Sequence, residues 1–304
     1  MTTVLAIVVN WRQPDLTIAC VQALRQMDHP DLHILVIDNG SGDGSARRLA
    51  DALPEERHLA LPHNLGFAGG YNSGIRLALS EQFDYTLMLN NDAFAAPDML
   101  RHLLAETAPD IGLLSPKILY DSQQDRLWFG GARRHKHLLE IRDRHQGAPD
   151  GPAWARSRDV DYLLGTCLLV NMDAARRVGL LDEAFFMYYE DLDWSIRMRQ
   201  AGYRLRFVAP ARLYHRVAVS SGGSDAPQYR YYLARGSVIF FRRYAHLGQP
   251  WAILLYRLGS AIKLLTHLAL TRQWSAARAY LRGLRDGWGE RTDGRKQKAE
   301  KGYG

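Results

Sequence analysis

The sequence predicts an α/β fold in which a mostly parallel sheet is flanked by helices and followed by a helical C-terminal region. Strand and helix patterns alternate over roughly the first 110 residues, which is typical of successive βαβ units. Several predicted strands end directly in polar residues. The chain has 304 residues, of which 47% are apolar, so it can bury a large core. This composition excludes a disordered or fibrous protein.

The first predicted strand is 4–9, and Pro14 marks the start of the helix that follows it. Apolar residues recur along this helix at helical spacing; they are Leu16, Ala19, Ala23, Leu24 and Met27. Because no basic segment with a long apolar run precedes the strand, the pattern of a signal peptide is missing. We therefore expect a cytoplasmic protein.

Two glycine-rich segments separate the next strands. The second strand, 32–38, runs into a turn at 39–45 whose small polar residues can cap the following helix. A short strand at 58–61 leads to a second glycine-rich turn, 64–74, which enters a helix ending near Ser80. This order of elements predicts two consecutive βα units.

The fourth strand, 84–92, ends in polar residues after an apolar run. In open α/β sheets, ligands bind beyond the carboxyl ends of the strands. Asp38, Asn64 and Asp92 lie at or near such ends. We therefore expect the ligand site at this edge of the sheet.

Shorter strands and turns follow between about 111 and 170, including a polar stretch at 133–158, which favours an insertion that shapes a cleft. A strand at 161–170 restores the apolar character of the core. A helix at 190–201 and a strand at 204–215 complete this part of the chain.

The two cysteines, Cys20 and Cys167, lie in a helical and a strand pattern and lack CxxC spacing. We expect buried thiols rather than zinc or redox chemistry. The formal net charge of +7 suits an anionic partner, which can be a nucleic acid, an acidic lipid surface or a nucleotide diphosphate. Much of the excess charge belongs to the C-terminal end, and charge alone does not choose among these partners.

A metal-dependent transfer with a diphosphate leaving group needs one carboxylate for the metal and a second, free carboxylate as base. Asn90, Asn91 and Asp92 place three oxygen-bearing side chains in succession, and such oxygens suit Mg²⁺ or Mn²⁺ beside a diphosphate. The alternative for Asp92 alone is a strand-end turn or a helix cap.

The second carboxylate is sought where Glu190 and Asp191 open a predicted helix. Acidic residues complement the helix dipole there and need no further role. The aromatic run at 185–189 favours a functional role, because an apolar wall raises the pKa of a carboxylate and poises it as a base. Asp193 and Trp194, further along the helix, can hold that base in place.

His215 ends a predicted strand and can complete a metal shell as a nitrogen ligand. A lone histidine is more often a hydrogen-bonded core or surface residue. His215 is therefore a candidate only together with Asp92.

Taken together, six motifs resemble those of the family-2 glycosyltransferases of the GT-A fold, and within them the rhamnosyltransferase-like branch. In chain order, the motifs are Val8–Trp11, Ile37–Ser41, Asn64–Gly74, Asn90–Asp92, Leu181–Phe186 and Glu190–Arg197. Each motif alone is weak, whereas all six in the correct order are specific.

The resemblance implies a Rossmann-like sheet and an inverting transfer of a sugar from a nucleoside-diphosphate donor, with rhamnose from dTDP-rhamnose favoured. The acceptor would be a saccharide or a lipid-linked saccharide in cell-surface polysaccharide synthesis. Asp38 would bind the donor's pyrimidine base, with Asn10 and Trp11 nearby. The other donor-side residues would be Asn39, Asn64, Gly66, Gly69, Gly70, Asn90 and Asn91.

By the same resemblance, Asp92 and His215 would hold Mg²⁺ or Mn²⁺ on the diphosphate, and Asp191 would deprotonate the acceptor hydroxyl. The acceptor-side residues would be Glu190, Asp193, Trp194 and Trp128. One departure concerns the metal: many members carry a DxD or DDD motif, whereas Asn90–Asp92 leaves a single carboxylate for it.

We expect a catalytic domain at 1–225, with a donor-binding half at about 1–110 and an acceptor-side half at about 111–225. A helical extension at 226–290 and a basic, disordered tail at 291–304 would follow.

The extension alternates aromatic and aliphatic residues with arginines over 229–280. This pattern fits a basic amphipathic helix in a membrane interface, at the inner face of the cell membrane, and it equally fits helices packed on the catalytic domain. Its most apolar stretch, 251–270, contains Arg257, Lys263 and His267, which are costly in a spanning helix.

Other functions fit the sequence less well. An oxidoreductase would carry GxGxxG after the first strand, where this chain has Asn10–Pro14. A nucleotidyltransferase would carry a basic glycine-rich loop in the same place. A non-catalytic binder of nucleic acid or anionic membranes would use the basic tail, but it leaves Asp38, Asp92, Glu190 and Asp191 unexplained. We therefore expect no nucleic-acid partner.

Overall fold

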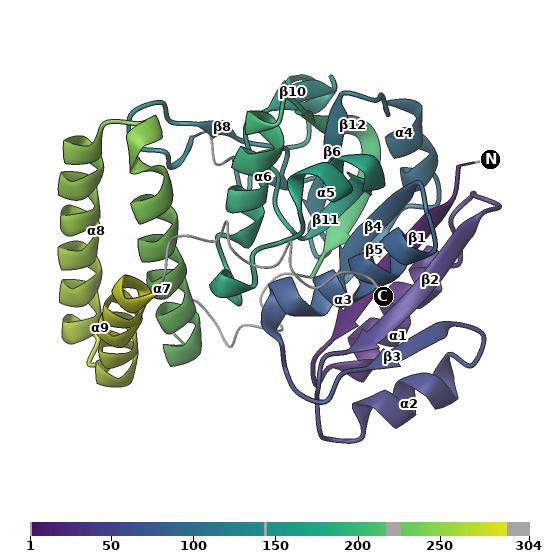
Figure 1. Cartoon of the computed structure of the whole chain (residues 1–304), viewed down its shortest axis with the longest axis horizontal. Coiled ribbons are helices and arrows are strands. Elements are labelled where there is room, and N and C mark those ends of the chain that lie inside the picture. The colour runs from purple at the N-terminus through teal and green to yellow at the C-terminus, as the bar shows by residue number, and fades with distance from the viewer. Residues whose placement is uncertain (1, 143–144, 217–225, 291–304) are drawn as a thin grey trace. The chain divides into compact units, whose positions relative to one another are not determined.

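The computed structural model of the chain describes residues 2–142, 145–216 and 226–290. They form two compact units, whose elements are labelled in Figure 1. The first unit comprises Met1–Arg134, Ile141–Leu181 and Asp191–Ser220. The second comprises His135–Glu140, Asp182–Glu190 and Ser221–Gly304. The basic tail expected at 291–304 lies outside the described residues.

The first unit is built on a sheet that has ten strands within its described residues (Figure 1). Eight of them follow the order β10-β12-β6-β11-β4-β1-β2-β3. At one end, β3 (Arg57–Ala60), β2 (Leu32–Asp38), β1 (Val4–Asn10) and β4 (Tyr85–Asn90) are parallel neighbours. This half confirms the predicted βαβ units, and β2 matches its predicted bounds.

Beyond β4 the sheet becomes mixed. β11 (Cys167–Asn171) runs antiparallel to both β4 and β6 (Ile111–Tyr120), and β12 (Arg204–His215) runs parallel to β6. The shorter strands are β5 (Ala93–Ala95), β7 (Leu127–Phe129), β8 (Arg133–Arg134), β9 (Ile141–Arg142) and β10 (Arg158–Val160), of which β8 and β9 form a separate hairpin. The expected α/β class is thus confirmed, with antiparallel strands added to the parallel half.

Helices flank the sheet, as predicted (Figure 1). They are α1 (Pro14–Leu24), α2 (Ser45–Ala52), α3 (Gly66–Ser80), α4 (Met99–Ala105), α5 (Met172–Val178) and α6 (Glu190–Gln200). Helix α6 ends where predicted, because Gly202 adopts a φ of +92°, which favours glycine. Cys20 and Cys167 are buried free thiols, as expected.

Two predicted segments differ from the structure. The glycine-rich stretch 64–74 is not a turn, because α3 already begins at Gly66. Glycine disfavours a helix in isolation, but here it lets α3 approach the sheet: a Cβ on Gly74 would lie 2.9 Å from Ile7. The strand predicted at 161–170 is shorter, since only residues 167–171 pair with β4.

The second unit contains α7 (Pro227–Tyr244), α8 (Pro250–Leu270) and α9 (Trp274–Gly289). Glycines let α7 and α9 pack closely: a Cβ on Gly283 would lie 2.3 Å from the Tyr231 carbonyl oxygen, and one on Gly287 would lie 2.8 Å from that of Arg235. The helical character expected for 226–290 is confirmed within the described residues.

The segment Asp182–Glu190 belongs to this helical unit and has an unusual backbone. Phe186, Tyr188 and Tyr189 adopt φ angles of +61°, +67° and +75°, a region that disfavours bulky side chains. Aromatic packing on α7 holds them: the Phe186 ring stacks on Tyr232 at 4.6 Å, and the Tyr189 ring lies 5.2 Å from that of Phe240.

The close approach of α3 to β1 predicts a steric effect of Gly74→Ala. The added methyl group would overlap Ile7 and Ile37, so we expect the free energy of unfolding to fall by about 1–3 kcal/mol. Gly259→Ala is the matched control, because a Cβ there meets open space within α8, and we expect it to leave stability unchanged or raised. Urea unfolding measures both. Equal stability of the two variants would contradict this account of the α3–β1 contact.

Candidate functional site

A buried hydrogen-bond network joins the carboxyl ends of β1 and β2. Asn10 Nδ2 donates to Asp38 Oδ1 at 2.8 Å, and the Ser41 hydroxyl donates to the same oxygen at 2.6 Å. The Ser41 amide donates to Asp38 Oδ2 at 3.0 Å. Asp38 is thus held rigidly at the strand end, where the sequence predicts the donor base. Trp11, which follows Asn10 in the chain, is half-buried.

A second set of amide bonds fixes the start of α3. Asn39 Nδ2 donates to the Gly66 carbonyl oxygen at 2.9 Å and to Asn64 Oδ1 at 3.1 Å, while its Oδ1 accepts from the Leu65 amide at 3.0 Å. Asn64 Oδ1 also accepts from the Gly66 amide. Asn39 therefore organises the glycine-rich segment, although the sequence places it among residues that touch the donor.

The glycines of α3 serve this packing as well. A Cβ on Gly70 would lie 3.0 Å from Asn39 Nδ2, and one on Gly69 would lie 2.5 Å from Leu65 Cβ. Gly66, Gly69 and Gly70 are all buried within the helix. Gly70 thus lets α3 approach Asn39 at the end of β2, and Gly69 makes room for Leu65 at the start of the same helix. The donor contact expected for these glycines stays a prediction.

The two asparagines that follow β4 bind other parts of the first unit. Asn91 Nδ2 donates to the Thr17 hydroxyl at 3.1 Å, and that hydroxyl in turn donates to Asn10 Oδ1 at 2.9 Å. Asn90 Oδ1 accepts from the Tyr71 hydroxyl at 3.4 Å. Both side chains thus tie the end of β4 to α1 and α3.

Asp92 pairs with His215, which lies at the end of β12. The distance from Asp92 Oδ1 to His215 Nε2 is 3.1 Å, and both side chains are buried. The Arg216 amide also donates to the Asp92 carbonyl oxygen. Trp128 packs edge-on against the His215 ring at 4.5 Å. The two residues predicted as metal ligands are therefore in direct contact, and a predicted acceptor-side residue covers one of them.

These atoms fit a divalent metal that is shared with a diphosphate. One carboxylate oxygen and one imidazole nitrogen converge, which are ligands that Mn²⁺ and Mg²⁺ accept. Within the described ranges, no three His, Cys, Asp or Glu side chains cluster closely enough to form a fully protein-bound site. The donor set therefore suits a metal whose remaining ligands are phosphate oxygens and water.

Asp191 is held near the same edge of the sheet by one loop. Its Oδ2 accepts from the Gly165 amide at 3.0 Å, and its Oδ1 accepts from the Leu192 amide at 2.8 Å. The neighbouring Thr166 carbonyl oxygen accepts from the Asn90 amide at 3.0 Å. Burial raises the pKa of the Asp191 carboxyl above its ordinary value, and the backbone amides that donate to it oppose this shift.

The following residues of α6 have a positioning role. Trp194 and Asp193 are fully buried; the Trp194 indole donates to the Gly179 carbonyl oxygen at 2.8 Å, and Asp193 pairs with Arg197 at 2.7 Å. Both side chains are thus engaged within the first unit, and their acceptor-side role stays a prediction. Glu190 is buried in the second unit, and its acceptor contact stays a prediction.

The sequence interpretation missed several residues that organise this site. Thr17, Tyr71 and Gly165 were not singled out, although they bind Asn91, Asn90 and Asp191; Ser41 was noted only as part of a motif. A hydroxyl on the buried face of the first helix was the one available signal for Thr17. Gly165 carries no such signal, because its partner lies in a distant helix.

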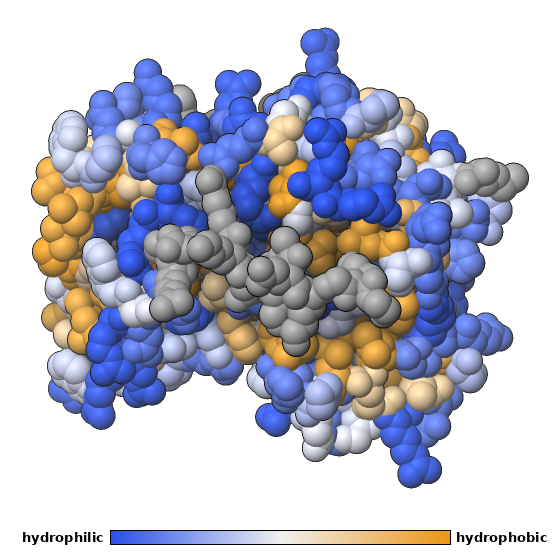
Figure 2. Space-filling view, in the orientation of Figure 1, coloured by the Kyte–Doolittle hydropathy of each residue, from blue (hydrophilic) through white to orange (hydrophobic). Residues whose placement is uncertain are grey.

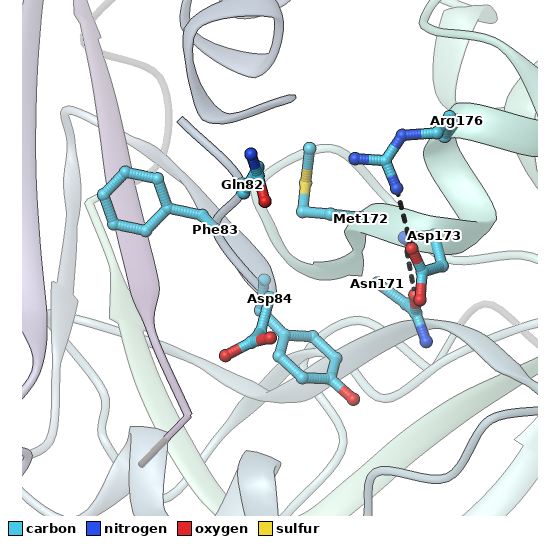
Figure 3. A pocket seen from close by; sticks show the side chains of 8 residues that line it. Gln82, Phe83, Asp84, Asn171, Met172, Asp173 and Arg176 are labelled. Atoms are coloured by element: carbon cyan, nitrogen blue, oxygen red, sulfur yellow. Dashed lines mark hydrogen bonds and ion pairs between the residues drawn. The ribbon is translucent and has the colours of Figure 1, made fainter. Parts of the chain in front are cut away.

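A cavity of about 340 Å³ lies at the opposite edge of the sheet (Figure 3). Its lining comes from residues 82–85, at the amino end of β4, and from 171–176, around the start of α5. Its charged groups are already engaged: Arg176 pairs with Asp173, and Asp84 accepts from the Thr3 amide and hydroxyl. The neutral Asn171 side chain caps α5. Because Asp92 follows the carboxyl end of β4, this cavity is separate from the candidate site.

Comparison with known families gives two overlapping matches. Residues 5–163 match the model of glycosyl transferase family 2, and residues 85–284 match that of glycosyl transferase family group 2. The N-acetylglucosaminyl-diphospho-decaprenol L-rhamnosyltransferase of Mycobacterium tuberculosis is 30% identical over 261 residues, which cover 77% of this chain and 82% of that protein. The dTDP-rhamnosyl transferase RfbF of Shigella flexneri is 20% identical, covering 72% and 74%.

Solved structures show the same fold at lower identity. GalNAc-T7, solved with UDP, GalNAc and Mn²⁺, matches with a TM-score of 0.63 at 14% identity, over 81% of this chain and 50% of that one. The mannosyltransferase PcManGT of Pyrobaculum calidifontis, solved with GDP-Man and Mn²⁺, matches with a TM-score of 0.54 at 18% identity, over 93% and 86%. These likenesses support the GT-A fold.

The amide network around Asn39 predicts that two isosteric changes will lower stability to different extents. Asn39→Asp replaces a donor that faces two oxygen atoms, so we expect a loss of about 2–4 kcal/mol in unfolding free energy near neutral pH. Asn64→Asp is the matched control, since Asn64 Oδ1 only accepts bonds in this network, and its loss should be small.

The pH dependence of the first variant has a definite sign. Burial and the facing oxygens raise the folded-state pKa of the new carboxyl at position 39, and the protonated form can donate one bond. Stability relative to wild type should therefore recover as pH falls and decline as pH rises through that pKa. Urea unfolding at several pH values measures this; equal effects of the two variants would contradict the assigned bonds.

Proposed function

Because the chain belongs to glycosyl transferase family 2, we propose that it transfers rhamnose from dTDP-rhamnose to a lipid-linked saccharide, with inversion of the anomeric carbon. The chain is an enzyme that uses a nucleotide-sugar donor in glycan synthesis. The observation that carries the proposal is that one loop contacts the backbone around Asp92 and the side chain of Asp191. The Gly165 amide donates to Asp191, and the next residue, Thr166, accepts from the Asn90 amide, two residues before Asp92. The named rhamnosyltransferases among its relatives support the choice of sugar.

On this proposal, the ends of β1 and β2 bind the nucleoside. Asp38, fixed by Asn10 and Ser41, presents a carboxylate whose bonds to the protein leave lone pairs to accept an N–H of a pyrimidine base. Trp11 follows this strand end and offers an aromatic surface. The bonds that fix Asp38 exist before the donor arrives, so little ordering accompanies binding.

Asp92 and His215 would hold the divalent metal, for which Mn²⁺ and Mg²⁺ are both suited. When bound, this ion would neutralise charge that develops on the departing diphosphate. The protein contributes one negative charge through Asp92, while Asn90 and Asn91 remain neutral and bind Tyr71 and Thr17.

Asp191 would act as the general base. It takes the proton of the acceptor hydroxyl as the oxygen attacks the anomeric carbon from the side opposite the diphosphate, and one displacement inverts that carbon. Burial raises the pKa of Asp191, which makes it a stronger base than an exposed aspartate. The Gly165 and Leu192 amides orient the carboxylate and favour its charged form.

Within the cell, the proposed site of action is the cytoplasmic side of the membrane that carries the lipid-linked acceptor. The name of the M. tuberculosis relative specifies such an acceptor, N-acetylglucosaminyl-diphospho-decaprenol. No nucleic-acid partner is part of this proposal.

Asp191→Asn tests the assignment of the base. We expect kcat to fall by about 10²–10⁴-fold, while dTDP still raises the melting temperature. In the wild type, kcat/KM should rise with pH as Asp191 loses its proton, with a midpoint above the ordinary range for aspartate. Asp173→Asn, at an exposed position of α5, is the matched control with unchanged rate. Unchanged turnover in the Asp191 variant would refute the assignment.

Asp92→Ala tests the metal and donor assignment. We expect dTDP-rhamnose with Mn²⁺ or Mg²⁺ to raise the wild-type melting temperature by roughly 5 °C or more, and chelation or Asp92→Ala to remove this shift. UDP- and GDP-linked sugars in the same screen test the choice of nucleotide. Asp51→Ala, exposed on α2, should retain the shift. A shift that survives chelation would argue against a metal-dependent donor site.

A further inference from the structure

Helix α8 presents an unusual apolar face to solvent. Trp251, Leu255, Leu258 and Ile262 are exposed by 66%, 61%, 51% and 65%. Their spacing of three to four residues places them in one stripe along the helix. Figure 2 shows this apolar stripe where Figure 1 draws α8. A stripe of large, exposed side chains of this length marks an interaction surface.

The charge around the stripe identifies its partner. Residues 250–285 contain six cations and neither Asp nor Glu; the cations are Arg257, Lys263, Arg272, Arg278, Arg282 and Arg285. Five of them, from Lys263 to Arg285, are exposed. Lys263 directly follows Ile262, about 100° around the helix, so it borders the stripe. An apolar face bordered by cations matches the boundary between acyl chains and anionic headgroups.

Exposed tryptophans lie at the ends of these helices. Trp251 opens α8, Trp274 opens α9 with an exposure of 55%, and Trp288 lies near the end of α9 with an exposure of 66%. Tryptophan prefers the interface between headgroups and acyl chains, where its ring is buried and its N–H stays hydrated. The exposure of these tryptophans in a folded unit therefore also favours a lipid surface as the partner.

The opposite face of α8 excludes a spanning orientation in the folded unit. By length and composition α8 is the one described helix apolar enough to cross a membrane: it has 21 residues, and an 18-residue stretch of it has a mean hydropathy of 1.4. However, Arg257 donates to the Ser237 hydroxyl at 2.6 Å and pairs with Glu140 at 3.6 Å. Ile253 and Leu268 are also buried in the unit. A spanning helix would have to break these contacts and expose Arg257 to lipid.

We propose that α8 lies flat in the surface of an anionic membrane, with the Trp251–Ile262 stripe in the outer acyl region and the neighbouring cations on lipid phosphates. A second copy of the chain fits the face less well, since two such surfaces would bring like charges together. The proposal goes beyond the transfer reaction, and the vesicle-binding measurement that tests it contains no sugar donor.

The test is flotation of the full chain with vesicles of phosphatidylcholine, with and without phosphatidylglycerol. We expect binding to the anionic vesicles that weakens as salt rises, and little binding to phosphatidylcholine alone. The double change Leu255→Ser with Ile262→Ser removes apolar side chains that are already exposed, so the fold should persist. It should lower the partition coefficient by about 100-fold.

A charge variant and its control complete the test. Lys263→Ser with Arg272→Ser should weaken binding to anionic vesicles and flatten its salt dependence. Arg47→Ser with Arg176→Ser removes two exposed cations from the first unit and should change neither. Melting temperatures and transfer to a water-soluble acceptor should match wild type in the α8 variants, which separates failure of this proposal from failure of the proposed reaction.

Three results would overturn the proposal. The first is vesicle binding that is absent, or unaffected by the serine changes on α8. The second is a wild-type dimer that these changes convert to a monomer, which would assign the face to a second copy. The third is protein in cell membranes that resists alkaline extraction, which would indicate a spanning helix.

Discussion

Two adjacent residues, Gly165 and Thr166, set the geometry on which the candidate site depends. The Thr166 carbonyl oxygen extends the sheet by accepting from the Asn90 amide, and the Gly165 amide donates to the Asp191 carboxylate. One short loop thus joins the end of β4, which carries Asp92, to the first turn of α6. A Cβ on Gly165 would lie 2.6 Å from the Phe67 ring, so the loop passes this ring as closely as glycine allows.

The neutral residues before Asp92 have a clear structural reason. Tyr71 donates to Asn90, whereas Asn91 donates to Thr17, which a carboxylate could not do. Carboxylates at positions 90 and 91 would also repel each other and Asp92 in a buried site. The departure from an aspartate-rich motif therefore reflects how β4 is tied to its neighbouring helices, and it leaves Asp92 as the single carboxylate of this segment.

Residues at strand ends could be predicted from sequence because their signal is local. Asp38 and Asp92 each follow an apolar run, and β12 has the predicted bounds. Contacts between distant segments could not be predicted in this way. The start of α3 depends on Asn39, from another strand, and the burial of Trp194 depends on the Gly179 carbonyl oxygen. These partners become visible only once the sheet has brought them together.

The left-handed backbone at Phe186, Tyr188 and Tyr189 depends on packing within the helical unit. Such conformations cost on the order of 1–3 kcal/mol each and persist only where packing enforces them. Here the enforcing surface is α7, through Tyr232 and Phe240, and the strained segment ends at the peptide that leads into Asp191. The segment Asp182–Glu190 is therefore no independent loop: a chain shortened before α7 would lose the aromatic packing that holds this backbone.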